Sequence, residues 1–387
     1  MLNNLGYVFS FLTLPLLISK YDVEKLGLVF TVQAIVLALA SIANYSFVYF
    51  IPTKSKQISQ SLEQFTKLWN LTVATRLLLS VLLSILSIVV VYLFFNQHFI
   101  LWLLSLTILI PKIVNPSLFF NALEQNKVIF KIGFFTKLLF LVSIYLSTSM
   151  YHINLLFGLS ELVVIGYFLV TINTSFFVIK FPSFIIILSF LKETFELFLV
   201  SFFSMLKPAS ILPTISYLLG NEYVTLYTLA EKFINVIRGV SGAVFVSFFP
   251  IYTKEKTKKT FLSVKNMLGI LLLSLIAVMA IWILSPYIIY YLNDFSSNTM
   301  ATKTLQILAL SIPMYFMIIP LFSYLLEHKK WTIILIFAII QLFVLFGLLI
   351  GFHQNIIQIA ISFVISEYVL LLSYYGYLKS KKINFFL

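Results

Sequence analysis

Residues 71–95 read LTVATRLLLSVLLSILSIVVVYLFF, a run of 25 residues in which Arg76 is the only charged side chain. The hydrocarbon core of a bilayer is about 30 Å thick, and a helix needs about 20 apolar residues to cross it. The run lacks the strict alternation of apolar and polar residues that a membrane barrel strand shows. It therefore predicts a transmembrane helix that carries an arginine within the membrane.

Runs of this kind recur along the whole chain of 387 residues, which is 61% hydrophobic and only 10% charged. A soluble domain carries about 25% charged residues, so the composition predicts a multi-pass membrane protein. Because the bilayer core holds no water, the spans satisfy their backbone groups as helices. Hydropathy predicts about twelve of them, at residues 5–19, 26–51, 71–95, 99–121, 128–147, 153–175, 194–219, 223–249, 266–291, 304–326, 331–352 and 356–378.

Two apolar segments are short for a membrane span. Residues 181–190 (FPSFIIILSF) begin beside a proline, and we interpret them as an interfacial piece that links two halves of the protein. The first span has about fifteen apolar residues, or ~22 Å of helix against a core of ~30 Å. A helix of this length falls short of a full crossing.

Two pairs of segments indicate an internal repeat. FVYFIP at residues 47–52 resembles FVSFFP at residues 245–250, at an offset of 198 residues. LEQNK at residues 123–127 resembles LEHKK at residues 326–330, at an offset of 203 residues. The matches predict an all-α fold of two six-helix lobes, 1–178 and 179–387. An even number of helices per lobe gives parallel repeats related by an axis along the membrane normal, which place a substrate site between the halves.

Lysines in the loops between spans predict the orientation. One set of alternate loops, together with the C-terminal tail, holds seventeen lysines, whereas the opposite set holds Lys20, Lys25 and Lys303. The excess of positive loop charge faces the cytoplasm, so both termini are predicted to be cytoplasmic. This distribution also explains the formal net charge of +13 without nucleic acid as a partner, and the lysine-rich inner loops suit anionic lipid headgroups.

Six basic side chains lie inside predicted spans, and they are Arg76, Lys112, Lys137, Lys207, Lys232 and Arg238. Each charge near the bilayer centre costs roughly 2.5–3.5 kcal/mol, so six cost on the order of 15–20 kcal/mol. The acids within or near the spans are Glu161, Glu196, Glu231 and Glu367. The surplus of cations predicts a solvated lumen that receives an anion, and a lipid-linked diphosphate sugar suits it through its phosphates and its acyl chain.

Lys112 is the strongest single candidate, because it lies too deep in its span to reach the headgroups. Pro111 and Pro116 bracket it and are predicted to bend the helix as hinges. An ion pair between Lys112 and Glu161 is the alternative to a role in the lumen.

The other charged positions leave their own alternatives open. Pro208 is a further predicted hinge beside Lys207, and Arg76 either faces the lumen or reaches the cytoplasmic headgroups. Glu161, Glu231 and Glu367 are predicted to carry a coupling ion or to act as counter-ions.

Several kinds of chemistry find no support in the sequence. The outer loops are too short for a catalytic domain, cysteine is absent, and the four histidines lack the spacing of metal ligands. There is no nucleotide-binding loop. We therefore predict a protein that is not an enzyme and that uses no cofactor and no metal.

Segments 26–54 (LGLVFTVQAIVLALASIANYSFVYFIPTK), 191–253 and 304–326 resemble Wzx-type O-antigen and capsular polysaccharide flippases. These proteins form part of the multidrug/oligosaccharidyl-lipid/polysaccharide (MOP) exporter superfamily. Lys232 matches a lysine that is frequent in the family, Arg238 is a looser match, and Lys207 is atypical.

The resemblance implies two six-helix bundles around a cationic lumen in the bacterial cytoplasmic (inner) membrane. It implies flipping of undecaprenyl-diphosphate-linked glycan repeat units by alternating access, for O-antigen or capsule biosynthesis. The implied partners are membrane lipids, a polysaccharide polymerase and a chain-length regulator.

Three other functions are weighed against this one. A membrane polymerase or glycosyltransferase needs a sizeable outer loop, which is missing here. A drug/cation antiporter of the same superfamily is expected to hold more acids than bases in its lumen, the reverse of the count above. A structural membrane subunit has no use for so many charges within the membrane.

Overall fold

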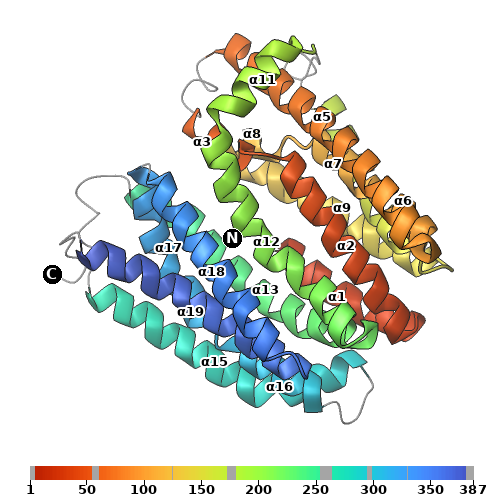
Figure 1. Cartoon of the computed structure of the whole chain (residues 1–387), viewed down its shortest axis with the longest axis vertical. Coiled ribbons are helices and arrows are strands. Elements are labelled where there is room, and N and C mark those ends of the chain that lie inside the picture. The colour runs from red at the N-terminus through yellow and green to blue at the C-terminus, as the bar shows by residue number, and fades with distance from the viewer. Residues whose placement is uncertain are drawn as a thin grey trace. The chain divides into compact units, whose positions relative to one another are not determined.

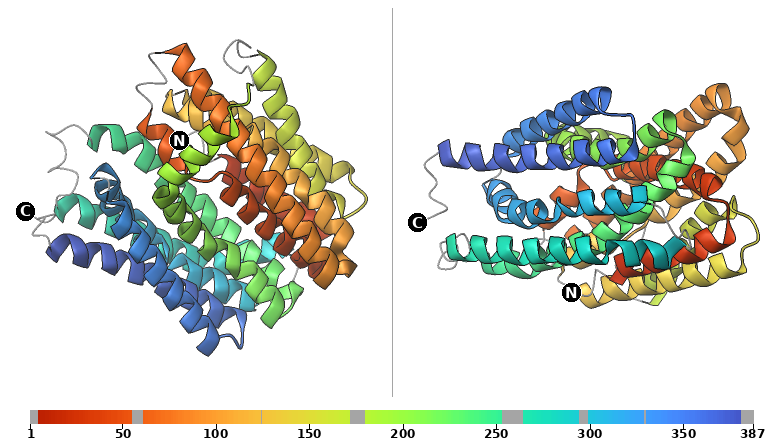
Figure 2. Two further views of the ribbon diagram at one scale, coloured as in Figure 1. Left: turned by 45° about the horizontal axis from the view of Figure 1, so that its top comes forward. Right: turned by 90° about the horizontal axis from the view of Figure 1, so that it is seen from below.

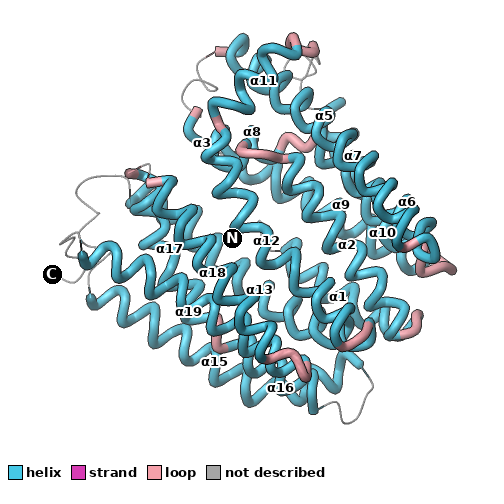
Figure 3. Tube along the Cα trace, in the orientation of Figure 1, coloured by secondary structure: helices cyan, strands magenta, loops and turns pink. Residues whose placement is uncertain are grey.

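The structure is a computed structural model that describes residues 5–54, 61–123, 125–171, 180–252, 264–293, 299–328 and 330–380. Every regular element in these ranges is a helix, as Figure 3 shows. The predicted all-α fold class is therefore confirmed. Ten helical segments of the described chain are long and apolar enough to cross a membrane: Val23–Ala43, Leu62–Phe94, Asn96–Ala122, Lys127–Leu146, His152–Thr171, Phe195–Leu218, Leu268–Tyr290, Thr299–Phe322, Trp331–Gly351 and Ile356–Ser380.

The remaining two predicted spans are also helices, but they lie outside this set of ten. Helix α1 (Leu5–Lys20) has 16 residues, which gives ~24 Å of helix. Helix α13 (Asn221–Tyr252) has 32 residues and is long enough to span. Its hydropathy is lowered by Glu222, Glu231, Lys232 and Arg238.

The quoted run forms most of helix α5 (Leu62–Phe94), which starts nine residues before the predicted boundary at Leu71. The Ser61 side chain accepts a hydrogen bond from the Gln64 N–H at 3.4 Å and caps the helix start. Phe65 is buried in this first part of the helix whereas Lys67 is exposed. Such an amphipathic turn lowers mean hydropathy, which is why the sequence placed the helix start too late.

The helices group into two compact units, which are described separately. The N-unit consists of residues 25–213 with the start of α1, and the C-unit consists of residues 10–24 and the chain from residue 214 onward. Helix α12 (Phe195–Leu218) begins in the N-unit and ends in the C-unit. The predicted repeat lobes, 1–178 and 179–387, stay a prediction.

The N-unit shows how breaks shape the predicted spans (Figure 1). The predicted span 26–51 is interrupted at residues 44–46, where Tyr45 has a φ of 51°. The predicted span 99–121 is interrupted at residues 114–116. The helices of this unit are α2 (Val23–Ala43), α3 (Phe47–Thr53), α5, η2 (Asn96–His98), α6 (Phe99–Ser105), η3 (Leu106–Ile108), α7 (Leu109–Ile113), α8 (Ser117–Ala122), α9 (Asn126–Leu146), α10 (His152–Thr171) and α11 (Phe184–Glu193).

The C-unit contains a corresponding break. The predicted span 304–326 is two helices that meet at Leu310 and Ser311, just before Pro313. Its helices are α13, α15 (Val264–Asn293), α16 (Thr299–Ala309), α17 (Ile312–Glu327), α18 (Trp331–Gly351) and α19 (Ile356–Ser380). Helices α18 and α19, drawn in blue, lie side by side in Figures 1 and 2. Helix α12 continues without interruption across Pro208, so this predicted hinge has no break in the structure.

Aromatic packing attaches the short helix α11 to the N-unit. The Phe190 ring stacks on Phe47 with centroids 4.9 Å apart, and the Tyr45 hydroxyl donates to the Leu191 carbonyl at 2.7 Å. The ten residues of α11 give ~15 Å of helix, which is too short to cross a membrane. The interfacial place that we predicted for residues 181–190 is compatible with this length.

Candidate functional site

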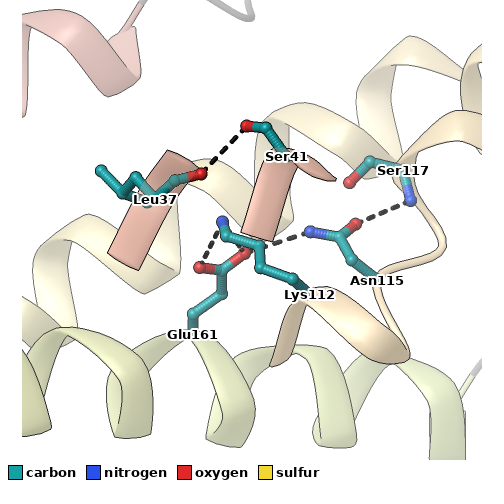
Figure 4. Close-up of polar contacts among 6 residues, drawn as sticks. All are labelled: Leu37, Ser41, Lys112, Asn115, Ser117 and Glu161. Atoms are coloured by element: carbon teal, nitrogen blue, oxygen red, sulfur yellow. Dashed lines mark hydrogen bonds and ion pairs between the residues drawn. The ribbon is translucent and has the colours of Figure 1, made fainter. Parts of the chain in front are cut away.

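The break in the fourth predicted span positions a polar cluster in the N-unit. Helix α7 ends at Ile113, and α8 begins at Ser117 after Pro116, which has no N–H to donate. The Asn115 side-chain oxygen accepts a hydrogen bond from the Ser117 N–H at 2.9 Å, which satisfies one backbone donor at the start of α8. The bend thus places Lys112 on a short helix and Asn115 on the non-helical link that follows it (Figure 4).

Lys112 and Glu161 form a direct ion pair, which is the alternative that we left open for Lys112. The Lys112 Nζ lies 2.7 Å from both carboxylate oxygens of Glu161. The Asn115 Nδ2 donates a third hydrogen bond to Oε1 of Glu161 at 3.1 Å (Figure 4). The Lys112 side chain keeps 32% of its surface exposed, whereas the Glu161 side chain keeps 9%. The Lys112 side chain is therefore partly exposed, whereas the Glu161 side chain is almost fully enclosed.

Arg76 lies in the same network but is bound only through neutral acceptors. Its Nε and Nη2 both donate to the Asn44 side-chain oxygen, at 2.9 and 2.6 Å, and its Nη1 donates to the Asn115 carbonyl at 3.0 Å. The guanidinium also lies over the Phe47 ring. Arg76 is only 3% exposed. The guanidinium is therefore enclosed by protein groups of the N-unit. Its role in the lumen or at the headgroups stays a prediction.

Lys137 on α9 adds a third cation to this cluster. Its Nζ lies 4.7 Å from the centroid of the Phe157 ring, an arrangement that stabilises a cation without neutralising it. It also interacts electrostatically with Lys112 and Glu161. Within the described ranges, Glu161 is the only carboxylate that forms an ion pair with any of these three cations. We call Arg76, Lys112, Lys137, Asn115 and Glu161 the N-unit cluster.

The C-unit contains a second polar cluster around Arg238 and Glu367. Arg238 donates to Asn235 at 3.0 Å and to the Ser311 hydroxyl at 3.1 Å, and its guanidinium lies 4.1 Å from the centroid of the Tyr315 ring. The Tyr315 hydroxyl donates to Glu367 at 2.6 Å. The Gln341 amide donates to the other oxygen of Glu367 at 3.2 Å. One tyrosine therefore connects the buried carboxylate with the arginine.

Both clusters contain an arginine, a helix break and a glutamate, and these follow one another in the same order along the chain. In each unit an arginine contacts a residue at a helix break, Asn115 in the first and Ser311 in the second. In each unit a buried glutamate from the last helix of the predicted repeat hydrogen-bonds to a side chain at or just after that break. The two arginines lie on non-equivalent helices of the predicted repeat, because Arg76 is on the third span of the first lobe and Arg238 is on the second span of the second lobe. The repeat therefore stays a prediction.

Three further predicted residues lie on helices α12 and α13. Lys207, Lys232 and Glu231 are half-buried, the first on α12 and the other two on α13. Glu231 interacts electrostatically with Tyr315. A substrate-binding role for the two lysines, and an ion-coupling role for Glu231, stay predictions.

Sequence reasoning missed the neutral members of both clusters. Asn44, Asn115, Tyr315 and Gln341 hold the charged groups in place, and none was a candidate. One signal was available for Asn115, which is a polar residue between two prolines inside an apolar run. In the described part of the chain, no group of three or more His, Asp or Glu residues is arranged to hold a metal ion.

Comparison with known proteins identifies solved structures that share the fold but no matching family model or curated sequence. No protein-family model and no curated protein sequence matches the chain. An inward-facing multidrug resistance MATE family transporter of the MOP superfamily matches with a TM-score of 0.65 at 14% identity, over 99% of this chain and 95% of that one. The lipid II flippase MurJ matches with a TM-score of 0.65 at 16% identity, over 92% of this chain and 87% of that one.

A third structure belongs to a MOP superfamily transporter from Pyrococcus furiosus, described as having a binding pocket of reversed polarity that suggests a different function. It matches with a TM-score of 0.68 at 15% identity, over 99% of this chain and 94% of that one. These identities support a shared fold alone. The chain has the fold of MOP superfamily transporters.

Proposed function

We propose that this protein is a flippase that moves a lipid-linked oligosaccharide, carried on undecaprenyl diphosphate, across the bacterial cytoplasmic membrane. The observation that carries the proposal is the N-unit cluster, which holds three cations and one carboxylate that is ion-paired with Lys112. A net positive site inside a membrane protein attracts an anion. A diphosphate joined to a polyprenyl chain supplies both the negative charge and an apolar tail that remains in the bilayer.

The fold supports transport as the general activity. One structural neighbour is described as a lipid II flippase, which is a protein that handles a lipid-linked substrate. Another neighbour is described by the reversed polarity of its binding pocket, so this fold accommodates pockets of different charge. We extend these descriptions to a cationic site here because the N-unit cluster holds Arg76, Lys112 and Lys137 and only one acid, Glu161. O-antigen or capsule repeat units are the substrates that the sequence resemblance favours.

A drug/cation antiporter is the second candidate, because MATE transporters are among the structural neighbours. A cationic drug needs an excess of carboxylates, and Glu161 is already paired with Lys112. The charge of the N-unit cluster therefore favours the anionic substrate. A transport assay with an organic cation and one with a lipid-linked diphosphate separate the two candidates.

The membrane location and the partners follow from the same proposal. Ten apolar helices fit a multi-pass protein. We propose the cytoplasmic membrane with both termini on its cytoplasmic side, where the lysine-rich loops contact anionic lipids. A polysaccharide polymerase and a chain-length regulator are the proposed protein partners. We propose no enzymatic activity, and the three structural neighbours described above are transporters.

The proposal is tested by reconstitution. The purified protein is placed in liposomes that contain an undecaprenyl-diphosphate-linked oligosaccharide, and the fraction of glycan accessible to an external lectin or glycosidase is followed over time. We expect faster exposure than in protein-free liposomes, and a large loss of rate for Lys112→Ala. The matched control is Lys131→Ala, an exposed lysine of the same unit. An unchanged rate for Lys112→Ala with full surface glycan in complemented cells contradicts the assignment of this site.

A further inference from the structure

The carboxylate of Glu161 binds the Lys112 amine through two oxygens, as a phosphate group can. Both carboxylate oxygens lie 2.7 Å from the Lys112 Nζ, within the distance range of charge-assisted hydrogen bonds. An amine that is already bound to an internal anion is not free for an external one. If Lys112 binds the substrate's phosphate, as the proposed function requires, Glu161 and that phosphate compete for the same cation.

The two partners differ in how accessible they are. Lys112 keeps 32% of its side-chain surface exposed, whereas Glu161 keeps 9%. Lys112 is therefore the more exposed member of the pair. Lys137 is close enough to interact with both members of the pair, so it adds positive charge where an anion would arrive.

The backbone indicates which partner is easier to move. Lys112 lies in α7, a helix of five residues that follows the 3-10 segment η3 and ends at the break of residues 114–116. Glu161 lies in the middle of α10, an uninterrupted helix of 20 residues. A short helix with irregular backbone at its end has fewer hydrogen bonds to hold it in place. Lys112 is therefore the partner that can turn away without deforming a long helix.

Glu161 retains other contacts when Lys112 leaves. The Asn115 Nδ2 donates to its Oε1 at 3.1 Å, and Lys137 interacts with it electrostatically. A buried carboxylate that loses all its partners is strongly destabilised, but one that keeps a hydrogen bond and a nearby cation is less so. The structure thus contains the elements for exchanging one anion for another at Lys112.

We propose that Glu161 is an internal counter-anion that holds Lys112 while the site is empty and that a phosphate group of the substrate displaces it. The inference rests on the proposed function and adds a competitive role for Glu161 to it. The proposal predicts the direction in which phosphate affinity changes when Glu161 is altered. Removing the negative charge of Glu161 strengthens phosphate binding, whereas a Glu161 that merely orients Lys112 for the ligand makes binding weaker when it is removed.

Inorganic pyrophosphate binding to the purified full-length protein in detergent tests this sign by titration calorimetry. If the pair leaves Lys112 free for a tenth to a fifth of the time, Glu161→Gln lowers the apparent Kd by about five- to tenfold. Glu161→Asp keeps the charge but shortens the side chain by one methylene, so its Kd falls between the wild-type and Glu161→Gln values. Glu193→Gln removes an exposed carboxylate of the same unit and leaves the Kd within about twofold, which controls for net charge.

Each outcome has one meaning. A tighter Kd for Glu161→Gln, lost again in the double variant with Lys112→Gln, supports the exchange. A weaker or unchanged Kd for Glu161→Gln overturns the exchange, while pyrophosphate binding by the wild type keeps the anion site of the proposed function. Absence of binding in the wild type and in all variants overturns both. If Glu161→Gln does not fold, Glu161→Asp replaces it. A tighter Kd for Glu161→Asp than for the wild type then supports the exchange, and a weaker or unchanged Kd overturns it.

Discussion

Gly158 on α10 lies directly against the backbone of Thr107 in η3. A β-carbon built on Gly158 would be 2.8 Å from both the carbonyl carbon and the carbonyl oxygen of Thr107. Only a residue without a side chain permits two backbone segments to approach this closely. Glu161 follows three residues later on the same helix, and Lys112 follows five residues after Thr107. The close contact therefore helps to fix the distance across which Lys112 and Glu161 meet.

Gly158→Ala is expected to destabilise the protein, because the added methyl group meets backbone that cannot rotate away. Inserting a methyl group into a tightly packed contact costs about 1–3 kcal/mol. Thermal unfolding of the purified protein in detergent measures the effect. Gly166→Ala is the matched control, because nothing lies within 4 Å of a β-carbon at that position of the same helix. Equal stability of the two variants contradicts the close contact at Thr107.

Asn44→Ala is expected to destabilise the N-unit, because the Arg76 Nε and Nη2 both lose their acceptor. Arg76 is buried, so the two donors do not gain water in exchange, and the loss is about 3 kcal/mol. Unfolding in detergent measures it. Asn121→Ala, an exposed asparagine on α8, is expected to change stability by less than about 0.5 kcal/mol. A similarly small change for Asn44→Ala argues against the contact with Arg76.

Tyr315→Phe is expected to weaken the C-unit cluster while it retains the aromatic ring beneath Arg238. The substitution removes the hydroxyl that donates to Glu367 at 2.6 Å, and a hydrogen bond to a charged group contributes about 1.5–3 kcal/mol. Tyr217→Phe removes a hydroxyl from a residue that is 87% exposed, so it serves as the control. The difference in melting temperature between the two variants reports the hydrogen bond. No difference means that the tyrosine and Glu367 are not paired in solution.

Single cysteines test the predicted orientation, because the natural chain contains none. Gln97→Cys and His353→Cys are exposed positions in predicted outer loops, and Lys131→Cys and Lys192→Cys are exposed positions on the predicted inner side. A membrane-impermeant maleimide added to intact spheroplasts is expected to label the first pair. The second pair is expected to react only after the membrane is permeabilised. The opposite pattern reverses the topology and places both termini outside.

Each of the twelve stretches that hydropathy predicted contains a helix, and ten helical segments of the described chain are long and apolar enough to cross a membrane. The bilayer imposes a length and a composition on such segments, which is why hydropathy finds them. Hydropathy joined α2 to α3 and α16 to α17, since a window average does not register a turn of two or three residues such as the one around Tyr45. The break beside Asn115 was predicted, because Pro111 and Pro116 lack the backbone N–H that a continuous helix requires. Prolines are visible in the sequence itself.

The sequence by itself determined that this chain crosses a membrane as helices and that it buries several cations there. Both conclusions follow from local composition, because the long apolar runs and the charges within them are visible in the sequence before any contact is known. Only the tertiary structure decided which neutral and charged groups meet those cations. Arg76 reaches Asn44, 32 residues away, and Lys112 reaches Glu161, 49 residues away. Contacts at such separations depend on how helices pack and where they break, and periodicity within one helix does not encode them.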